Sequence, residues 1–173
     1  DQSSRVTMTE TELKTYVDVS HEDGVIEKEE KKLIYNVFDF GDSVAKDIMI
    51  PRIDMTSIDV NATYDELLAL FRESMYSRIP VYENEVDNII GMVIVKDFLL
   101  VENREHFRIQ DILREGYYTY EYKKTADLLL EMRLLTTNVA FVLNEYGAAV
   151  GMITVEDLLE EIVGEIRDEY DAD

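Results

Sequence analysis

The sequence contains no cysteine and only two histidines among its 173 residues. Without cysteine, the chain forms no disulfide bond, holds no thiolate metal site and has no cysteine nucleophile. His21 and His106 are too few for a metal site built from several histidines. No apolar run approaches the roughly 20 residues that a membrane-spanning helix needs, and the first residues do not resemble a signal peptide. Hydrophobic residues still make up 46% of the chain, as is usual for a globular protein with a buried core.

Cationic residues are also scarce, because 17 Lys and Arg stand against 38 Asp and Glu, for a formal net charge of −21. A protein that binds DNA or RNA replaces phosphate counterions with its own cations. An anionic membrane surface would repel this chain for the same reason. We therefore expect no nucleic-acid partner. The chain starts without Met and ends in an acidic run, so we expect it to be a piece of a longer protein.

An internal repeat occupies most of the chain after residue 43. Residues 79–100 align without gaps on residues 139–160, and seven of these 22 positions are identical, among them Gly91/Gly151, Met92/Met152 and Asp97/Asp157. Further upstream, residues 47–49 (DIM) match residues 111–113 (DIL). The repeat is about 60 residues long, and one copy buries too little surface to form a stable domain by itself. We expect two copies that pack their sheets face to face.

The hydrophobic pattern predicts the same order of elements, β-α-β-β-α, in both copies. In the first copy we expect strands at 55–60, 79–82 and 89–95, a helix at 64–76 and a turn at 83–88. In the second we expect strands at 117–122, 139–143 and 148–154 and a helix at 126–135. A final helix is expected near Asp97 and near Asp157. Residues 1–43 read as two helices, so we predict an α+β chain divided into residues 1–43, 44–104 and 105–173.

The sharpest local signal is the segment Gly151–Asp157 (GMITVED), where a strand gives way to a helix. Free backbone amides and the helix dipole favour an anion at such a turn, and the Thr154 hydroxyl can bond a phosphate oxygen. Asp157 lies one turn away, where its carboxylate can accept hydrogen bonds from ribose hydroxyls. The same Thr-x-x-Asp pattern is also close to a helix capping box, which needs no ligand. The residues alone leave both interpretations open.

The order of these motifs resembles a CBS-domain pair, or Bateman module. Residues 47–52 (DIMIPR), 76–81 (YSRIPV) and 151–166 (GMITVEDLLEEIVGEI) more narrowly resemble the CorC/HlyC family, whose hemolysin-like members are related to the CNNM magnesium transporters. The resemblance implies a tandem CBS pair with pseudo-two-fold packing, preceded by a helical segment that joins it to a membrane domain. It also implies an adenine nucleotide, AMP or ATP, as a regulatory ligand.

In such pairs a cleft combines the Thr and Asp of one unit with the strand-entry residues of the other. The resemblance therefore pairs Thr154 and Asp157 with Tyr76, Ser77 and Arg78. Arg78 would supply the cation for phosphate in this acidic chain, where screening limits long-range repulsion to about 8 Å. Ser77 would bond the ligand and Tyr76 would lie against the base or sugar. Pro80, in the same motif, and the apolar Ile50 and Met55 complete the predicted nucleotide site.

The second, quasi-symmetric cleft would join Ile94 and Asp97 to Thr136, Thr137 and Asn138. Because Ile94 cannot hold a phosphate and position 138 lacks an arginine, we expect this cleft to be empty or weak.

Two metal interpretations are unfavourable. An EF-hand with Gly24 at its sixth loop position would place Val19, which cannot bind Ca²⁺, at the first. The acids after Asp157 are expected to form a solvated helix face rather than a Mg²⁺ site, namely Glu160, Glu161, Glu165, Asp168, Glu169 and Asp171. The same acidity favours ATP bound with Mg²⁺, because the metal cancels two phosphate charges.

We predict a regulatory module without enzyme activity, because no Ser-His-Asp set, Walker loop or paired acid and base is present. The resemblance implies that it senses an adenine nucleotide, forms a homodimer and controls a magnesium or other divalent-cation transporter. Its partner would be the transmembrane domain of the same full-length protein, at the cytoplasmic face of the membrane. The alternative is a structural dimerisation module with no ligand.

Overall fold

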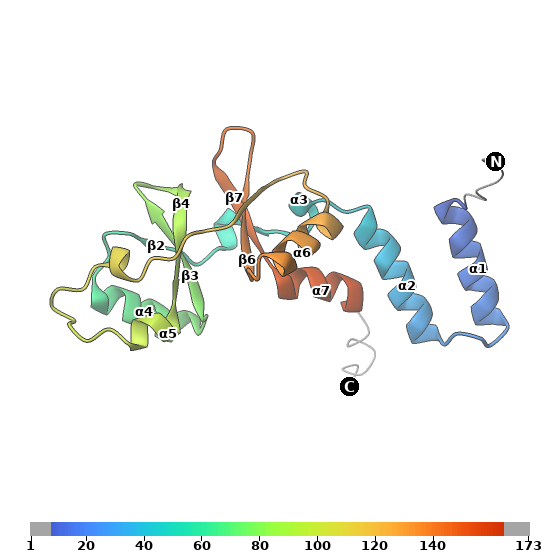
Figure 1. Cartoon of the computed structure of the whole chain (residues 1–173), viewed down its shortest axis with the longest axis horizontal. Helices are drawn as coiled ribbons and strands as arrows, with labels where there is room; N and C mark the ends of the chain where they lie inside the picture. Colours follow the sequence, from blue (N-terminus) through green and yellow to red (C-terminus); the bar gives the residue numbers. More distant parts are fainter. Residues whose placement is uncertain (1–7, 165–173) are drawn as a thin grey trace.

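The computed structural model describes residues 8–164 as a helical hairpin followed by two α/β units. The hairpin consists of α1 (Glu10–Glu22) and α2 (Lys28–Gly41) and lies at one end of an elongated molecule (Figure 1). Thr9 caps α1, because its side chain accepts a hydrogen bond from the Glu12 amide. Within the described residues no helix is long and apolar enough to cross a membrane.

The first unit contains a three-stranded sheet in the order β2-β3-β4. Strand β2 (Ile58–Asp59) runs parallel to β3 (Arg78–Glu83), which pairs antiparallel with β4 (Glu85–Ile94). Helices α4 (Tyr64–Ser74) and α5 (Val95–Leu99) pack on this sheet. A capping box begins α4, where Thr63 and Glu66 each accept the other's backbone N–H.

The second unit contains a four-stranded sheet in the order β1-β7-β6-β5. Strand β5 (Tyr118–Tyr120) runs parallel to β6 (Val139–Leu143), and β6 pairs antiparallel with β7 (Ala149–Thr154). Helices α6 (Thr125–Leu134) and α7 (Val155–Val163) cover it. The β-α-β-β-α order predicted for each repeat is therefore confirmed.

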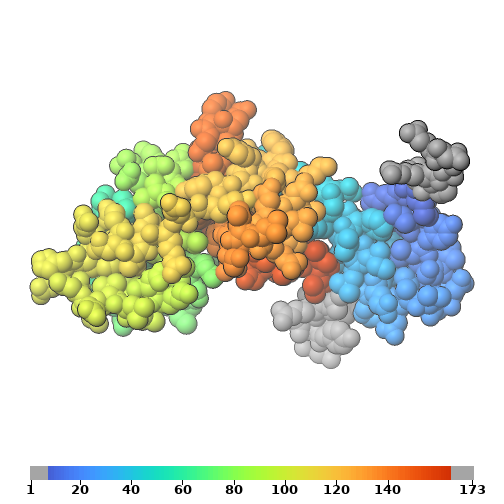
Figure 2. All heavy atoms as spheres, in the orientation of Figure 1, coloured from blue at the N-terminus to red at the C-terminus, as the bar shows by residue number. Residues whose placement is uncertain are grey.

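Each repeat lends its leading segment to the other unit. Helix α3 (Ala45–Ile48) packs in the core of the second unit, and strand β1 (Ile50–Pro51) pairs with β7 there. In return, Ile109 is buried in the first core, and Arg114 forms a backbone bridge with Met92 of β4. The segment that links the units, near residues 100–120, runs over the surface from one to the other (Figure 2, yellow). The two units are thus interlocked at both ends.

Two glycines of the repeat make these crossings possible. A Cβ atom on Gly91 would lie 2.2 Å from the carbonyl oxygen of Arg114, and one on Gly151 would lie 2.6 Å from that of Ile50. Both positions therefore exclude a side chain, because a borrowed backbone passes directly over them. The identity of Gly91 and Gly151 between the repeats is explained by this close approach.

A separate apolar cluster lies between the two sheets and joins the units. It contains Phe141, which is fully buried, together with Ile89, Met92, Val139 and Ala149. The phenol of Tyr118, on β5, donates a hydrogen bond of 2.8 Å across the junction to the Ile89 carbonyl on β4. The expectation of two sheets packed against each other is met by this cluster.

The N-terminal hairpin docks on the second unit. Phe40 of α2 is buried in that unit's core, and its carbonyl accepts a hydrogen bond of 2.8 Å from the Thr125 hydroxyl. The Asn36 side chain donates to the Ile162 carbonyl of α7 at 3.0 Å. These contacts fix the N-terminal hairpin to the second unit rather than to the first unit, which follows it directly in the sequence.

Several predicted bounds differ from the structure. Helices α5 and α7 begin two residues earlier than expected, so Asp97 and Asp157 lie inside their first turns. Of the strand expected at 55–60 only Ile58–Asp59 forms, and a 3₁₀ turn lies before it at Arg52–Asp54. The turn expected at 83–88 is tighter, since Asn84 reverses the chain at a φ of 67°. Of the acidic run, Glu160 and Glu161 lie in α7, whereas Glu165, Asp168, Glu169 and Asp171 lie outside the described residues.

Candidate functional site

A cavity of about 360 Å³ lies where the two repeats meet. Its size is within the range of small-molecule sites. Seven of the eight residues predicted for the nucleotide site line it, namely Ile50, Met55, Tyr76, Ser77, Arg78, Pro80 and Thr154. The fold therefore brings together residues that are up to 104 positions apart in the sequence, from Ile50 to Thr154.

The polar wall of this cavity is formed where α4 ends and β3 begins. Met75 takes a left-handed conformation with a φ of 60°, which ends α4 and reverses the chain toward β3. Ser77 follows, and its carbonyl accepts a hydrogen bond of 2.8 Å from the Val95 amide, which fixes the start of the strand. Arg78 then opens β3 opposite Ile94. The short turn thus presents the Tyr76, Ser77 and Arg78 side chains together.

Arg78 is the cation of the cavity. Its side chain is half-buried and forms no hydrogen bond or ion pair with any residue between 8 and 164. An acid, Asp54, also lines the cavity and was missed by the sequence reasoning. In a chain of net charge −21, an arginine without an acidic partner is the group that a phosphate can bind locally.

Thr154 and Asp157 form a capping box at the start of α7. The Thr154 hydroxyl accepts from the Asp157 amide at 3.1 Å, and Asp157 Oδ2 accepts from the Thr154 amide at 3.1 Å. Asp157 is the one predicted site residue that does not line the cavity. Its second oxygen, Oδ1, accepts no hydrogen bond from the residues that the structure describes. The capping interpretation therefore describes the geometry, and it leaves one carboxylate oxygen open.

The apolar wall comes from both repeats. Ile50 of β1 lies beside Met152 of β7, its partner in the antiparallel pair. The sequence reasoning missed five lining residues, namely Asp54, Thr56, Met75, Val139 and Met152. Met152 could have been found, because strand alternation places it two residues before Thr154 and on the same face. The wall gives a flat base an apolar surface beside the hydroxyls and Arg78.

A second cavity of about 540 Å³ occupies the quasi-symmetric position. Four of the five residues expected there line it, namely Ile94, Thr136, Thr137 and Asn138, whereas Asp97 does not. The cavity shares Ser77 and Arg78 with the first one. It also contains Arg114, which the sequence reasoning did not consider. Arg114 donates to both oxygens of Asp97, from Nε at 2.7 Å and from Nη2 at 2.9 Å. This hydrogen-bonded ion pair holds the pKa of Asp97 below its usual value, so the carboxylate is charged at neutral pH.

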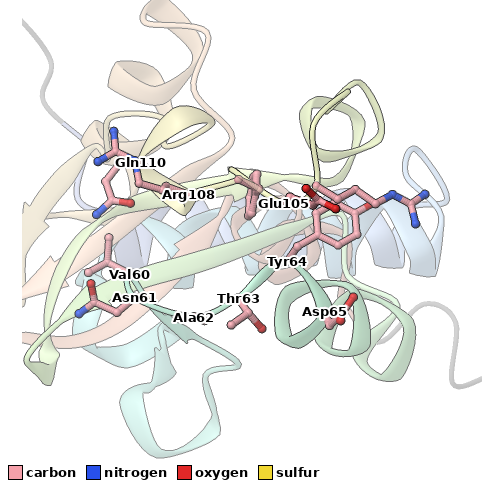
Figure 3. A pocket seen from close by; sticks show the side chains of 11 residues that line it. Val60, Asn61, Ala62, Thr63, Tyr64, Asp65, Glu105, Arg108 and Gln110 are labelled. Atoms are coloured by element: carbon pink, nitrogen blue, oxygen red, sulfur yellow. The ribbon is translucent and has the colours of Figure 1, made fainter.

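A third cavity, of about 620 Å³, lies in the first unit alone (Figure 3). Residues 60–65 form one wall, and Glu105, Arg108 and Gln110 lie on the other. Two of its polar side chains already have partners, because Thr63 belongs to the cap of α4 and Arg108 pairs with Asp111 at 3.7 Å. The smaller cavity between the repeats is favoured as the functional site because Arg78, which has no acidic partner among the described residues, lines it beside hydroxyls and an apolar wall.

The family profile and the most similar proteins point to the same family. The CBS domain profile matches residues 45–103 and 121–164. The chain is 34% identical over 171 residues to the UPF0053 protein YrkA of Bacillus subtilis, covering 95% of this chain and 39% of that protein. It is 36% identical over 164 residues to the magnesium and cobalt efflux protein CorC of Escherichia coli K12, covering 94% and 56%. The chain thus spans well under two thirds of these relatives.

Solved structures agree with the sequence relatives. The CBS domain of a bacterial CNNM/CorC family Mg²⁺ transporter superposes with a TM-score of 0.85 at 36% identity, covering 92% of this chain and 99% of that one. The same kind of domain in complex with ATP gives 0.74 at 37% identity, covering 79% and 99%. A CBS-domain pair with bound AMP from Klebsiella pneumoniae gives 0.62 at 31% identity, covering 70% and 98%.

Proposed function

Because the chain belongs to the CBS-domain family, as a CBS pair of the CorC and hemolysin-like group, we propose that it binds an adenine nucleotide between its repeats. The observation that carries this proposal is the cavity in which Arg78, Ser77 and Thr154 meet an apolar wall. Arg78 binds phosphate, the two hydroxyls orient it, and the base lies against Ile50, Met55 and Met152. The open oxygen of Asp157 accepts the ribose hydroxyls. ATP-bound and AMP-bound relatives support this class of ligand.

The proposed role is regulation rather than catalysis. In the full-length protein the module lies at the cytoplasmic face of the membrane and controls a transporter of magnesium or another divalent cation. The naming of CorC as an efflux protein for magnesium and cobalt supports this assignment. Nucleotide binding alters transport if the two states of the module differ in affinity for it. ATP binds with Mg²⁺, because the metal offsets phosphate charge in a chain this acidic.

The module forms a homodimer through its helices. Exposed apolar side chains occur on α5, α6 and α7 and just after the ends of α4, α5 and α6, namely Met75, Leu99, Leu100, Leu130, Leu134, Leu135, Leu159 and Val163. Leu134 is 83% exposed, which is costly for a residue of this size unless a partner covers it. Sedimentation equilibrium should give twice the chain mass of 20.1 kDa, and a monomer at all concentrations would contradict this part of the proposal.

A second function, dimerisation without a ligand, is favoured by one observation. The capping box of Thr154 and Asp157 is complete in the ligand-free fold and accounts for both residues. The two functions differ in whether the residues around the cavity affect nucleotide affinity, so the tests below measure affinity and stability separately.

Replacing Arg78 by alanine is expected to weaken ATP binding at least tenfold, since a charge-assisted hydrogen bond to phosphate contributes about 1.5–3 kcal/mol. Adenosine, which has no phosphate, should lose much less affinity. Calorimetric titration of ATP and adenosine, with and without Mg²⁺, checks both values. Arg72→Ala is the matched control, because it removes the same charge from an exposed position on α4. If wild-type chain and Arg78→Ala gave no saturable heat with any nucleotide, the ligand-free function would stand.

Replacing Asp157 by alanine should lower nucleotide affinity and also remove half of a cap. Glu66→Ala is its matched control, because Glu66 occupies the same third position in the capping box of α4. Each variant should lose about 1 kcal/mol of unfolding free energy. Only Asp157→Ala should reduce the affinity for ATP and for adenosine, by about tenfold for a lost hydrogen bond to a charged group. Equal affinities in the two variants would reduce Asp157 to a capping residue.

A further inference from the structure

The second cleft contains an arginine, Arg114, that the repeat alignment alone does not place there. Extending the repeat alignment from Asp47/Asp111 by three residues makes Arg114 the equivalent of Ile50. The structure agrees with this equivalence, because Ile50 pairs with Met152 and Arg114 pairs with Met92, and these two methionines are themselves equivalent. Arg114 therefore stands in the second cleft where Ile50 forms the apolar wall of the first.

The two equivalent acids differ in what already binds them. Asp157 uses one oxygen for the Thr154 amide, and its other oxygen is open to a ligand within the described structure. At Asp97 both oxygens already accept a hydrogen bond, because the Arg114 guanidinium donates to each of them. Arg114 stands where Ile50 would face the base in the first cleft. Its guanidinium thus covers the Asp97 carboxylate, which would otherwise accept hydrogen bonds from a ribose.

We propose that Arg114 is an internal occupant of the second cleft and closes it to nucleotides. Arg114 lines the cavity, and its guanidinium provides Asp97 with the two donors that a ribose would provide. Ile94 adds a smaller obstacle, since it withholds the hydroxyl that Thr154 offers in the first cleft. Lys96 lines the same cavity and can supply a cation for phosphate, whereas Arg78, which lines both cavities, serves the first one in the proposed function. Arg114, together with Ile94, therefore limits the chain to one nucleotide. The identity of the ligand in this inference rests on the proposed function.

The closure can be removed without disturbing the fold. The interlock between the units at this point is made by backbone atoms, since the Met92 amide donates to the Arg114 carbonyl at 3.0 Å and the Arg114 amide donates back at 2.9 Å. The Arg114 side chain itself is 49% exposed. Replacing it by isoleucine, the residue of the first cleft, should therefore leave both units folded.

The test is the stoichiometry of ATP binding, measured calorimetrically in the presence of Mg²⁺. Wild-type chain should bind one ATP, and the opened variant Arg114→Ile/Ile94→Thr should bind two. Ile94→Thr alone is the matched control and should remain at one, because Arg114 still covers Asp97. A folded opened variant that stays at one ATP, or an Ile94→Thr variant that reaches two, would overturn the inference. Arg114→Gln/Ile94→Thr, which cannot fork onto both oxygens, replaces the opened variant if thermal melting shows that isoleucine unfolds it.

Adding Asp157→Ala to the opened variant locates the new site. The gained binding should persist in that variant, because the second cleft does not use Asp157. This design also separates the two proposals. If wild-type chain binds no ATP and the opened variant binds one, the proposed function is wrong and Arg114 is still the closing residue. If wild-type chain binds one ATP and the opened variant gains none, the proposed function stands and Arg114 is not the closing residue.

Discussion

Replacing Phe141 by alanine is expected to lower the free energy of unfolding by about 3–5 kcal/mol, the usual cost of removing a buried phenylalanine. Phe141 is fully buried and lies in the cluster that joins the two sheets. Its ring lies 5.8 Å from that of Tyr118, measured between centroids. The backbone there is held on both sides, because the Phe141 amide donates to the Tyr117 carbonyl at 2.8 Å. Collapse around the cavity is thereby limited, which keeps the cost high.

Urea denaturation followed by circular dichroism measures this loss. Phe141→Leu is the conservative companion and should retain most of the stability. Leu128→Ala removes a fully buried side chain from the second unit's own core and provides the control for position. It should also be strongly destabilising, but it should not alter the contact between the units. A loss below about 1 kcal/mol for Phe141→Ala would mean that the junction is less well packed than the cluster indicates.

Replacing Gly91 by alanine is expected to cost about 1–3 kcal/mol or more, because the added methyl has no space. The Cβ would lie 2.2 Å from the Arg114 carbonyl oxygen, which is backbone and is itself held in the bridge to Met92. Either the bridge must open or β4 must move. At Gly151 the Cβ would meet the Ile50 carbonyl at 2.6 Å and the end of the flexible Met49 side chain, also at 2.6 Å. The loss there should be smaller than at Gly91.

Thermal melting of the three variants Gly91→Ala, Gly151→Ala and Gly41→Ala checks the order. Gly41 ends α2, and a Cβ on it meets no atom within 4 Å. Alanine there should be neutral or stabilising by up to about 1 kcal/mol, because glycine is the poorer helix former. Equal melting temperatures for Gly91→Ala and Gly41→Ala would mean that the Arg114 segment does not approach Gly91 as closely as the structure places it.

The sequence was sufficient for features that depend on local or repeated patterns. The repeat followed from aligned residues, and the order of elements in each copy followed from the hydrophobic pattern. Seven of the twelve residues that line the first cavity were also predicted, with the family resemblance as the guide. These features are carried by short segments whose pattern is visible without the fold.

The exchange of leading segments could not be predicted in the same way. Strand β1 has two residues, which is too short for any periodicity, and it pairs with a strand about 100 positions away. An alignment of the repeats shows that Ile50 and Arg114 are equivalent, but not which sheet each joins. The pairing of Arg114 with Asp97 depends on that choice. The proposed closure of the second cleft therefore depends on the three-dimensional fold, whereas the isoleucine at position 94 is visible in the sequence.

Helix α7 has a consequence for how a binding event could leave the cavity. Its first turn begins at Thr154 in the cavity wall, and near its last turn the Ile162 carbonyl is tied to Asn36 of α2. Nine helical residues at about 1.5 Å each span roughly 13 Å. A hydrogen-bonded helix of this length hardly compresses along its axis. One end of α7 therefore lies in the cavity wall and the other is hydrogen-bonded to the N-terminal hairpin. A shift of the helix at the cavity would move its contact with that hairpin.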